Sequence, residues 1–222
     1  MAWLRNDEIG LATYDQTLRS VLPFTKNRSS LLSGIDAVQY TIGMGELNFY
    51  DAVSSCLDWM NAGSGKTSLL VLTTGLDSSP ASHWDNLAQK ARKEGAVIFA
   101  VGLGASLRGK PLRKSRRQGP ETHPGNSPGQ SDANSAFEKA DAALNMLAAM
   151  TGGQAYFPDS SAAFAPAYRE IAAALRNQYV LGINAAADGR FHRLTVEVPP
   201  ENPRSAAPNR ILVREGYLAP QP

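Results

Sequence analysis

The stretch Gly63-Ser64-Gly65-Lys66-Thr67 has the residue types of a phosphate-binding loop, in which backbone N–H groups and a lysine hold phosphate oxygens. That motif requires a further glycine at position 60, where this sequence has Met60. It also follows a strand and opens a helix, whereas here a helical pattern comes first and an apolar strand pattern follows. We therefore interpret the stretch as a Gly/Ser turn and expect no nucleotide site.

Histidine and cysteine form no recognisable catalytic set along the sequence. His83 begins a helical pattern, His123 lies in a polar stretch and His192 lies in a strand pattern, and none stands beside an evident nucleophile. A hydrolase would need a histidine, a serine and a carboxylate to converge in one cleft. Cys56 lies in a helical pattern, so we interpret it as a buried apolar residue, with a reactive thiol as the alternative. We expect that the protein is not an enzyme.

The apolar run from Leu69 to Leu72 is the segment that most clearly predicts a position for ligands. A short, continuous apolar run predicts a strand that is buried on both faces of a parallel sheet. In such sheets ligands bind outside the carboxyl ends of the strands. The turn from Thr73 to Asp77 is therefore the first place to expect a binding site.

Strand and helix patterns alternate along most of the chain. Asn27 and Ser82 are placed to cap helices, and Leu32 and Ile35 lie on the apolar face of the first helix. The predicted strands cover 8–14, 17–24, 68–73, 96–103 and 154–157, and the predicted helices cover 28–38, 49–61, 82–94, 136–150 and 161–176. This alternation predicts an α/β fold: a doubly wound, mostly parallel sheet with helices on both faces.

Residues 104–135 interrupt the alternation, because they are rich in Gly, Pro, Ser and Asn. We interpret them as a flexible, solvated insertion within a domain that covers residues 1–177. Anion docking, to nucleic acid or to another acidic partner, is the alternative, although no aromatic side chain among the basic residues offers bases a stacking platform. The candidate anion-binding residues are Arg108, Lys110, Arg113, Lys114, Arg116 and Arg117. The net charge of the whole chain is only +2, so nucleic acid is not an expected partner.

Residues 178–222 change in character. Strand patterns over 178–183, 191–198 and 210–218 have no helix between them, and Ala187-Asp188-Gly189 provides a turn. They predict a C-terminal antiparallel β extension packed on the domain. No stretch reaches the roughly 18 apolar residues of a membrane span, and the first eight residues lack the apolar core of a signal peptide.

Several segments together resemble a von Willebrand factor A (VWA) domain: 8–14, 45–52 with its Tyr50-Asp51 pair, 70–77 with its Thr73-Thr74-Gly75 turn, and 96–104. Segments 151–158, 175–182, 190–198 and 214–220 resemble the bacterial branch of these domains that is common in Acidobacteria, known as VWFA-related domains. The resemblance covers nearly the whole chain outside 104–135. It implies a doubly wound sheet that binds a partner protein, usually through Mg²⁺ at the carboxyl end of the sheet.

The metal ligands implied by the resemblance are an Asp-x-Ser-x-Ser after the first strand, a threonine before the Tyr-Asp helix and the aspartate of a Thr-Asp-Gly turn, all hard oxygen donors. This sequence contains no Asp-x-Ser-x-Ser, the threonine position falls on Leu47, and the aspartate position falls on Thr74. Asn48 and Asp77 are nearby oxygen donors at displaced positions. We expect a degenerate metal site with no cofactor, and we expect Asp51 and Asp77 to cap or orient loops.

The resemblance also places the family's first strand and most of its first helix before Met1. Without that strand, its neighbours must pair differently or leave edges open. We favour an N-terminally truncated sequence, and a different strand in the same place is the alternative. Relatives in this branch are usually exported, so an exported protein is implied if an upstream segment is missing, and the compartment stays open.

We expect a non-enzymatic, adhesion-type module that binds a protein partner without metal. The partner and the oligomeric state are not indicated by the sequence. The residues predicted to form the partner-binding rim are Gly43, Met44, Gly45, Leu47, Asn48, Thr74, Gly75 and Asp77. One alternative is a Mg²⁺-dependent VWA binding domain completed by a missing N-terminal segment, and the other is docking of an anion on the basic loop.

Overall fold

The computed structural model describes residues 7–38, 47–61, 65–78, 83–104, 128–184, 187–198 and 211–221, with the backbone alone at 128–133. The strands are β1 (Ile9–Tyr14), β2 (Leu18–Thr25), β3 (Ser68–Thr73), β4 (Val97–Gly102), β5 (Ala155–Tyr156), β6 (Phe191–Arg193) and β7 (Gly216–Leu218). The helices are α1 (Arg28–Asp36), α2 (Phe49–Met60), α3 (Trp84–Lys93), α5 (Pro128–Thr151) and α6 (Ser161–Arg176).

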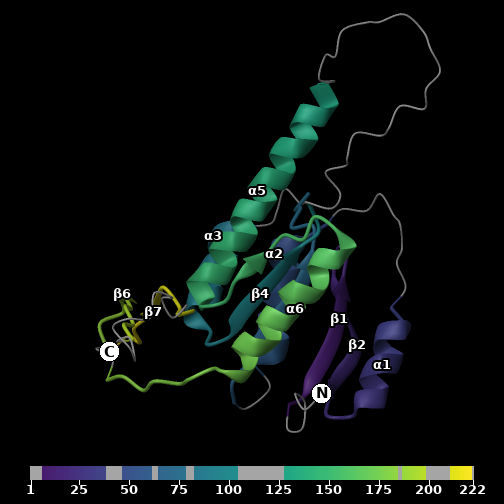
Figure 1. Ribbon diagram of the computed structural model, residues 1–222. Coiled ribbons are helices and arrows are strands. Elements are labelled where there is room, and N and C mark those ends of the chain that lie inside the picture. Colours follow the sequence, from purple (N-terminus) through teal and green to yellow (C-terminus); the bar gives the residue numbers. More distant parts are fainter. Residues whose placement is uncertain are drawn as a thin grey trace, which may run out of the picture.

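The centre of the molecule is a parallel sheet of order β3-β4-β5 with helices on both faces, which confirms the predicted α/β class (Figure 1). Strand residues that point to one face, such as Val71 and Ile98, pack with α2, α3 and α5 in the larger part of the core. Residues of β4 that point to the other face, Phe99 and Val101, pack against Ile171 of α6. The alternating faces of the strands therefore divide the helices into two layers.

The predicted hairpin of β1 and β2 is confirmed, but it forms a separate antiparallel sheet. The hairpin is held against α2: the rings of Phe24 and Trp59 stack with their centroids 4.6 Å apart. Gly10 allows the close approach, because a Cβ at this position would lie 2.5 Å from the Trp59 ring. Asn27 caps α1 as predicted, accepting hydrogen bonds from the N–H groups of Ser29 and Ser30.

Strand β3 differs from the prediction that it would be buried on both faces. Leu70 and Leu72 are 44% and 47% exposed. The reason is that, among the described strands, β3 lies at the edge of its sheet and α6 covers its neighbour β4 instead. Leu32 and Ile35, on the apolar face of α1, are also about half exposed, and α1 has no buried residue.

Helix α5 begins at Pro128, inside the segment predicted as a flexible insertion. Proline is well suited to the first turn of a helix, because its fixed φ fits and its missing N–H is not needed there. The predicted basic cluster, from Arg108 to Arg117, lies outside the described residues. In the part of the chain that is described, no helix combines the length and the hydropathy required to cross a membrane.

The tail forms a small antiparallel sheet of β6 and β7, as predicted. The strand predicted over 178–183 is absent, because the described residues 178–184 belong to no strand. Gln178 is instead held at the amino end of β3, where its carbonyl accepts from Lys66 Nζ at 3.0 Å and its Nε2 donates to Ser68 Oγ at 3.4 Å. Tyr179, next in sequence, is 88% exposed. The sheet of β6 and β7 is joined to α3 by Arg214, which lies just before β7 and whose Nη2 donates to the Arg92 carbonyl at 2.7 Å.

Candidate functional site

The carboxyl ends of β1 and β3 meet at one end of the molecule. The Tyr14 hydroxyl and the Thr73 hydroxyl share a hydrogen bond, and Thr73 Oγ1 also accepts from the N–H of Gly75 at 2.9 Å. Both strands end at these residues, so the bond joins the hairpin to the parallel sheet. Burial is the main cause that raises the pKa of Tyr14, so its hydroxyl stays protonated.

The turn after β3 depends on glycine. Gly75 has a φ of +71°, a left-handed conformation that glycine adopts without strain. A Cβ at this position would also lie 2.9 Å from Leu144 Cδ1 of α5. The turn therefore packs directly against the hydrophobic core, and its contact with α5 fixes its conformation.

Asp77 caps α2 from the loop that follows β3. Its Oδ2 accepts a hydrogen bond of 2.9 Å from the N–H of Tyr50, the second residue of the helix. Asn48, which occupies the N-cap position, makes no capping bond with its own side chain. A negative charge near the first N–H groups of a helix is stabilising, so this carboxylate has the capping role predicted for it. Asp51 lies in the first turn of α2 and is exposed.

Further hydrogen bonds join three loops into one surface. Ser78 donates its N–H to the Leu47 carbonyl at 2.9 Å, and its Oγ accepts from the Leu47 N–H at 2.7 Å. Asn48 donates its N–H to the Asp15 carbonyl at 3.2 Å and its Nδ2 to the Gln16 carbonyl at 3.1 Å. Five predicted rim residues thus lie in connected loops, which are Leu47, Asn48, Thr74, Gly75 and Asp77. The other three, Gly43, Met44 and Gly45, lie outside the described residues.

A row of aromatic rings lies beneath this rim. Phe49 is fully buried and contacts Tyr14 and Tyr50, with ring centroids 6.2 Å and 5.6 Å away. Tyr50 in turn meets the edge of Trp84 at 5.6 Å. Burial, and then the charge of Asp77, raises the pKa of Tyr50. Sequence reasoning did not predict this row, although the adjacent aromatic pair at the start of α2 was a signal for it.

Neither described histidine belongs to a catalytic set. His192 Nε2 contacts both carboxylate oxygens of Asp188, at 3.0 Å and 3.1 Å, and its ring stacks on Tyr217. The hydrogen bond from His192 is the main cause that lowers the pKa of Asp188. His83 precedes α3 and makes no capping bond. Among the described residues, therefore, no histidine contacts both a serine and a carboxylate.

The surroundings of Cys56 and Lys66 are those of structural residues rather than of a reactive thiol and a phosphate-binding lysine. Burial raises the pKa of the Cys56 thiol to about 11, which disfavours the reactive thiolate. Lys66 lies between α2 and β3 and donates to a backbone carbonyl, so the order of elements is the reverse of a phosphate-binding loop. His, Cys, Asp and Glu side chains form no group of three or more that could hold a metal, as far as the chain is described.

Comparison with known proteins gives a family match and distant structural neighbours. The model of the von Willebrand factor type A domain matches residues 4–163. No curated protein matches the chain. Each solved structure named below is under 20% identical to the chain.

An uncharacterized membrane-spanning protein from Vibrio fischeri is 19% identical, with a TM-score of 0.33 over 75% of both chains. The conserved hypothetical protein BatB from Bacteroides thetaiotaomicron is 16% identical, with a TM-score of 0.48 over 77% of this chain and 78% of its own. An aerotolerance-related membrane protein from Bacteroides fragilis, carrying multiple mutations to serine, is 13% identical, with a TM-score of 0.49 over 76% of this chain and 80% of its own. On the strength of the family match, which spans more than half of its residues, the chain belongs to the von Willebrand factor type A domain family.

Proposed function

We propose that the chain is a non-enzymatic module that binds a protein partner, without a metal ion, through the rim at the carboxyl ends of β1 and β3. Domains of this family are in general interaction modules. The observation that carries the proposal is that three loops from distant parts of the sequence are tied together there by backbone and side-chain hydrogen bonds. A rim held in one shape loses little conformational freedom on binding, which favours affinity.

The donor groups at the rim do not fit a magnesium ion. Mg²⁺ requires several hard oxygen ligands in near-octahedral geometry. Leu47 has no side-chain oxygen, Thr74 Oγ1 accepts from the Leu76 N–H at 3.4 Å, and Asp77 Oδ2 is engaged by the helix it caps. We therefore propose a degenerate metal site whose oxygens hold the loops instead.

The partner surface would be partly apolar. Leu47 is partly exposed at the rim, and its side chain offers an aliphatic contact where the family pattern has a metal ligand. Met44 belongs to the same predicted contact. We propose a protein partner that presents an apolar side chain here rather than a carboxylate, because a carboxylate of the partner would need a cation on the rim to bind it.

One observation favours a second candidate, a Mg²⁺-dependent domain whose cation site is completed by acidic residues of a further segment. Asn48 Oδ1 is buried and accepts no hydrogen bond from the described residues. A segment carrying acidic residues, together with this oxygen, could form a cation site. Docking of an anion on the basic residues from Arg108 to Arg117 stays a prediction, as does membership of the acidobacterial branch.

The proposal is tested by capture from an extract of the source cells in the presence of EDTA. The immobilised wild-type chain is compared with Leu47→Glu and with the control Leu32→Glu, whose side chain is half exposed on α1. We expect at least one protein that the wild type and the control retain and that Leu47→Glu loses. Capture that requires Mg²⁺, or that Leu47→Glu leaves unchanged, would contradict the proposal.

A further inference from the structure

A groove of about 470 Å³ lies between α3 and the small sheet of β6 and β7, and we call it the tail groove. Helix α3 ends where β4 begins, at the amino end of that strand, whereas the rim lies at the carboxyl ends of β1 and β3. The tail groove and the rim are therefore separate surfaces. The residues that line the groove are Gln89, Arg92, Phe191, Arg193, Glu215 and Leu218.

The pairing of β6 with β7 puts an apolar floor and a cation on the same face of the small sheet. Phe191 pairs with Leu218, and Arg193 pairs with Gly216. Residues that are two apart on a strand, or directly opposite each other on paired strands, share a face. Glycine is needed at position 216, because a Cβ there would lie 2.5 Å from Phe191 Cζ. The floor of the groove is thus the ring of Phe191 together with Leu218.

This floor is open to solvent, and a cation from α3 is held over it. Phe191 is 41% exposed and Leu218 is 38% exposed. The guanidinium carbon of Arg92 lies over the Phe191 ring, 5.5 Å from its centroid, where the face of the ring attracts a positive charge. The groove therefore combines uncovered apolar surface with a cation whose position is fixed.

The charges that line the groove do not balance. Arg92 Nη2 lies 3.8 Å from Glu215 Oε2, and Arg193 Nη2 lies 3.5 Å from Glu215 Oε1. Charge-assisted hydrogen bonds of this kind are about 2.7–2.9 Å long, so neither contact is a close one. Arg92 Nε is also buried without a hydrogen-bond partner among the described residues. Two guanidinium groups share one carboxylate, and their N–H groups are available for a second one.

Neighbouring side chains of the described chain do not provide that second carboxylate. Arg214 Nη2 donates to the carbonyls of Arg92 and Glu94, at 2.7 Å and 3.4 Å, and so neutralises the carbonyl end of α3. The Glu94 carboxylate accepts a hydrogen bond from Asn61 Nδ2. Glu215 is the only carboxylate among the described residues that line the groove. The excess positive charge therefore favours an acidic ligand.

The openness of the groove favours an extended segment of a larger molecule over a small ligand. The side chain of Arg193 is 77% exposed, and those of Arg92 and Glu215 are 39% exposed. Pockets for small ligands bury about 70–90% of the ligand surface. Phe191 and Arg193 are two residues apart on β6, which corresponds to about 6.8 Å along a strand. An extended peptide has the same spacing between side chains at positions i and i+2.

We propose that the tail groove binds an extended acidic segment of a protein partner, in which a carboxylate faces Arg92 and Arg193 and an apolar side chain two residues away faces Phe191 and Leu218. This binding site is additional to the rim and does not rest on the function proposed for it. The partner's carboxylate competes with Glu215 for the same two guanidinium groups. Removing the charge of Glu215 should therefore strengthen binding, whereas removing either arginine should weaken it.

The test uses the peptide acetyl-Gly-Leu-Ser-Asp-Ser-Leu-Gly-amide, whose symmetric order presents an acid and an apolar side chain at the required spacing in either direction. Its Kd is measured from amide chemical shifts in an NMR titration of the isotope-labelled full chain. One matched peptide has Asn in place of Asp, and another has Ser in place of both leucines. The small carboxylate 3-phenylpropionate is titrated separately. The melting temperature and the molar mass in solution are recorded for every variant.

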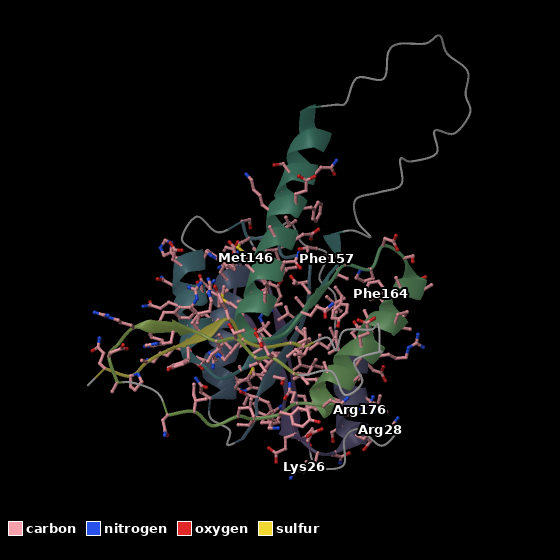
Figure 2. All side chains as sticks on the ribbon, turned by 60° about the vertical axis from the view of Figure 1, so that its left-hand side comes forward. Lys26, Arg28, Met146, Phe157, Phe164 and Arg176 are labelled. Carbon is pink, nitrogen blue, oxygen red and sulfur yellow. The ribbon has the colours of Figure 1, made fainter. Side chains whose placement is uncertain are left out.

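We expect saturable shifts at the amides of Arg193 and Leu218, with a Kd of about 1 mM or lower. The two matched peptides should bind at least about fivefold more weakly. Arg193→Gln should weaken binding about two- to fivefold, as for an exposed ion pair, and Glu215→Gln should strengthen it by a similar factor. The control Arg176→Gln should leave the Kd unchanged, because it removes the same charge at the end of α6, on the face of the parallel sheet opposite to α3 (Figure 2).

Several results would overturn the proposal. Absence of saturable shifts, equal binding of the Asp and Asn peptides, or equal effects of Arg193→Gln and Arg176→Gln would exclude a specific carboxylate site. Weaker binding by Glu215→Gln would show that this carboxylate does not compete with the ligand. Tighter binding of 3-phenylpropionate than of the peptide would assign the groove to a small carboxylate. A dimer that dissociates in Arg193→Gln and excludes the peptide would assign it to a second copy of the chain.

Discussion

Asp77 Oδ2 accepts a hydrogen bond of 2.9 Å from the N–H of Tyr50, so a carboxylate in the loop after β3 caps a helix whose second residue lies 27 positions earlier in the sequence. This contact gives the only acidic residue of the proposed rim a structural role. It also links the loop that follows the edge strand to the helix on which the hairpin is packed.

Replacing Asp77 by alanine should lower the free energy of unfolding by about 0.5–2 kcal/mol, because α2 loses its cap. Chemical denaturation measures the change. Asp51→Asn is the matched control, since Asp51 is an exposed carboxylate in the first turn of the same helix and should contribute less than about 1 kcal/mol. Equal losses in the two variants would show that the Asp77–Tyr50 bond has no special role.

Gly75→Ala should destabilise the chain by about 1–3 kcal/mol through strain at its φ of +71° and more through the contact with Leu144. Gly65→Ala separates the two effects, because Gly65 has a φ of +116° but no heavy atom within 4 Å of the added Cβ. We expect the thermal midpoint to fall further for Gly75→Ala. A smaller fall than in Gly65→Ala would contradict the buried position of the turn.

The bond between Tyr14 and Thr73 should couple the hairpin to the parallel sheet. A double-mutant cycle with Tyr14→Phe and Thr73→Val measures the coupling free energy, which we expect at about 0.5–1.5 kcal/mol. A value near zero would mean that the packing on α2 and the bonds of Asn48 to the hairpin turn hold the hairpin in place without the Tyr14–Thr73 bond.

Cys56 should react slowly with iodoacetamide in the folded chain. Its pKa is raised by burial from 9.0 to about 11, so at pH 8 about a hundredfold less thiolate is present than for the unperturbed group. The raised pKa also makes the free energy of unfolding depend on pH. The Cys56 thiol ionises at a lower pH in the unfolded chain than in the folded chain, so its contribution to stability is complete below pH 9.0 and is lost as the pH rises toward 11. Labelling at the rate of the urea-unfolded chain at pH 8 would contradict this account.

Local sequence patterns predicted the elements of the fold well. The β1–β2 hairpin, α2 and the strands β3 and β4 each follow from the periodicity of their own residues, and Asn27 was identified as a cap from its position alone. The start of α5 was missed, because a proline among polar residues indicates a loop as readily as the first turn of a helix.

Contacts between distant segments explain what the sequence did not predict. The run from Leu69 to Leu72 is apolar throughout, yet the exposure of Leu70 and Leu72 depends on which strand lies beside β3. The apolar segment after Gln178 has the composition of a strand, but the bonds of Gln178 to Lys66 and Ser68 hold its first residue at the amino end of β3. At the rim, the hydrogen-bond partners of Leu47 and Thr74 could not be predicted from the sequence, because they lie in loops without a repeating pattern. That these two residues stand in place of metal ligands stays a prediction.

The most direct test of a metal-independent rim is a thermal melt of the chain with EDTA and with millimolar Mg²⁺ or Mn²⁺. An ion that binds only the folded state must raise the melting temperature. We expect the same cooperative transition in all three conditions. A transition that moves upward with Mg²⁺ and returns with EDTA would show that the folded chain binds the ion and would contradict a metal-independent rim.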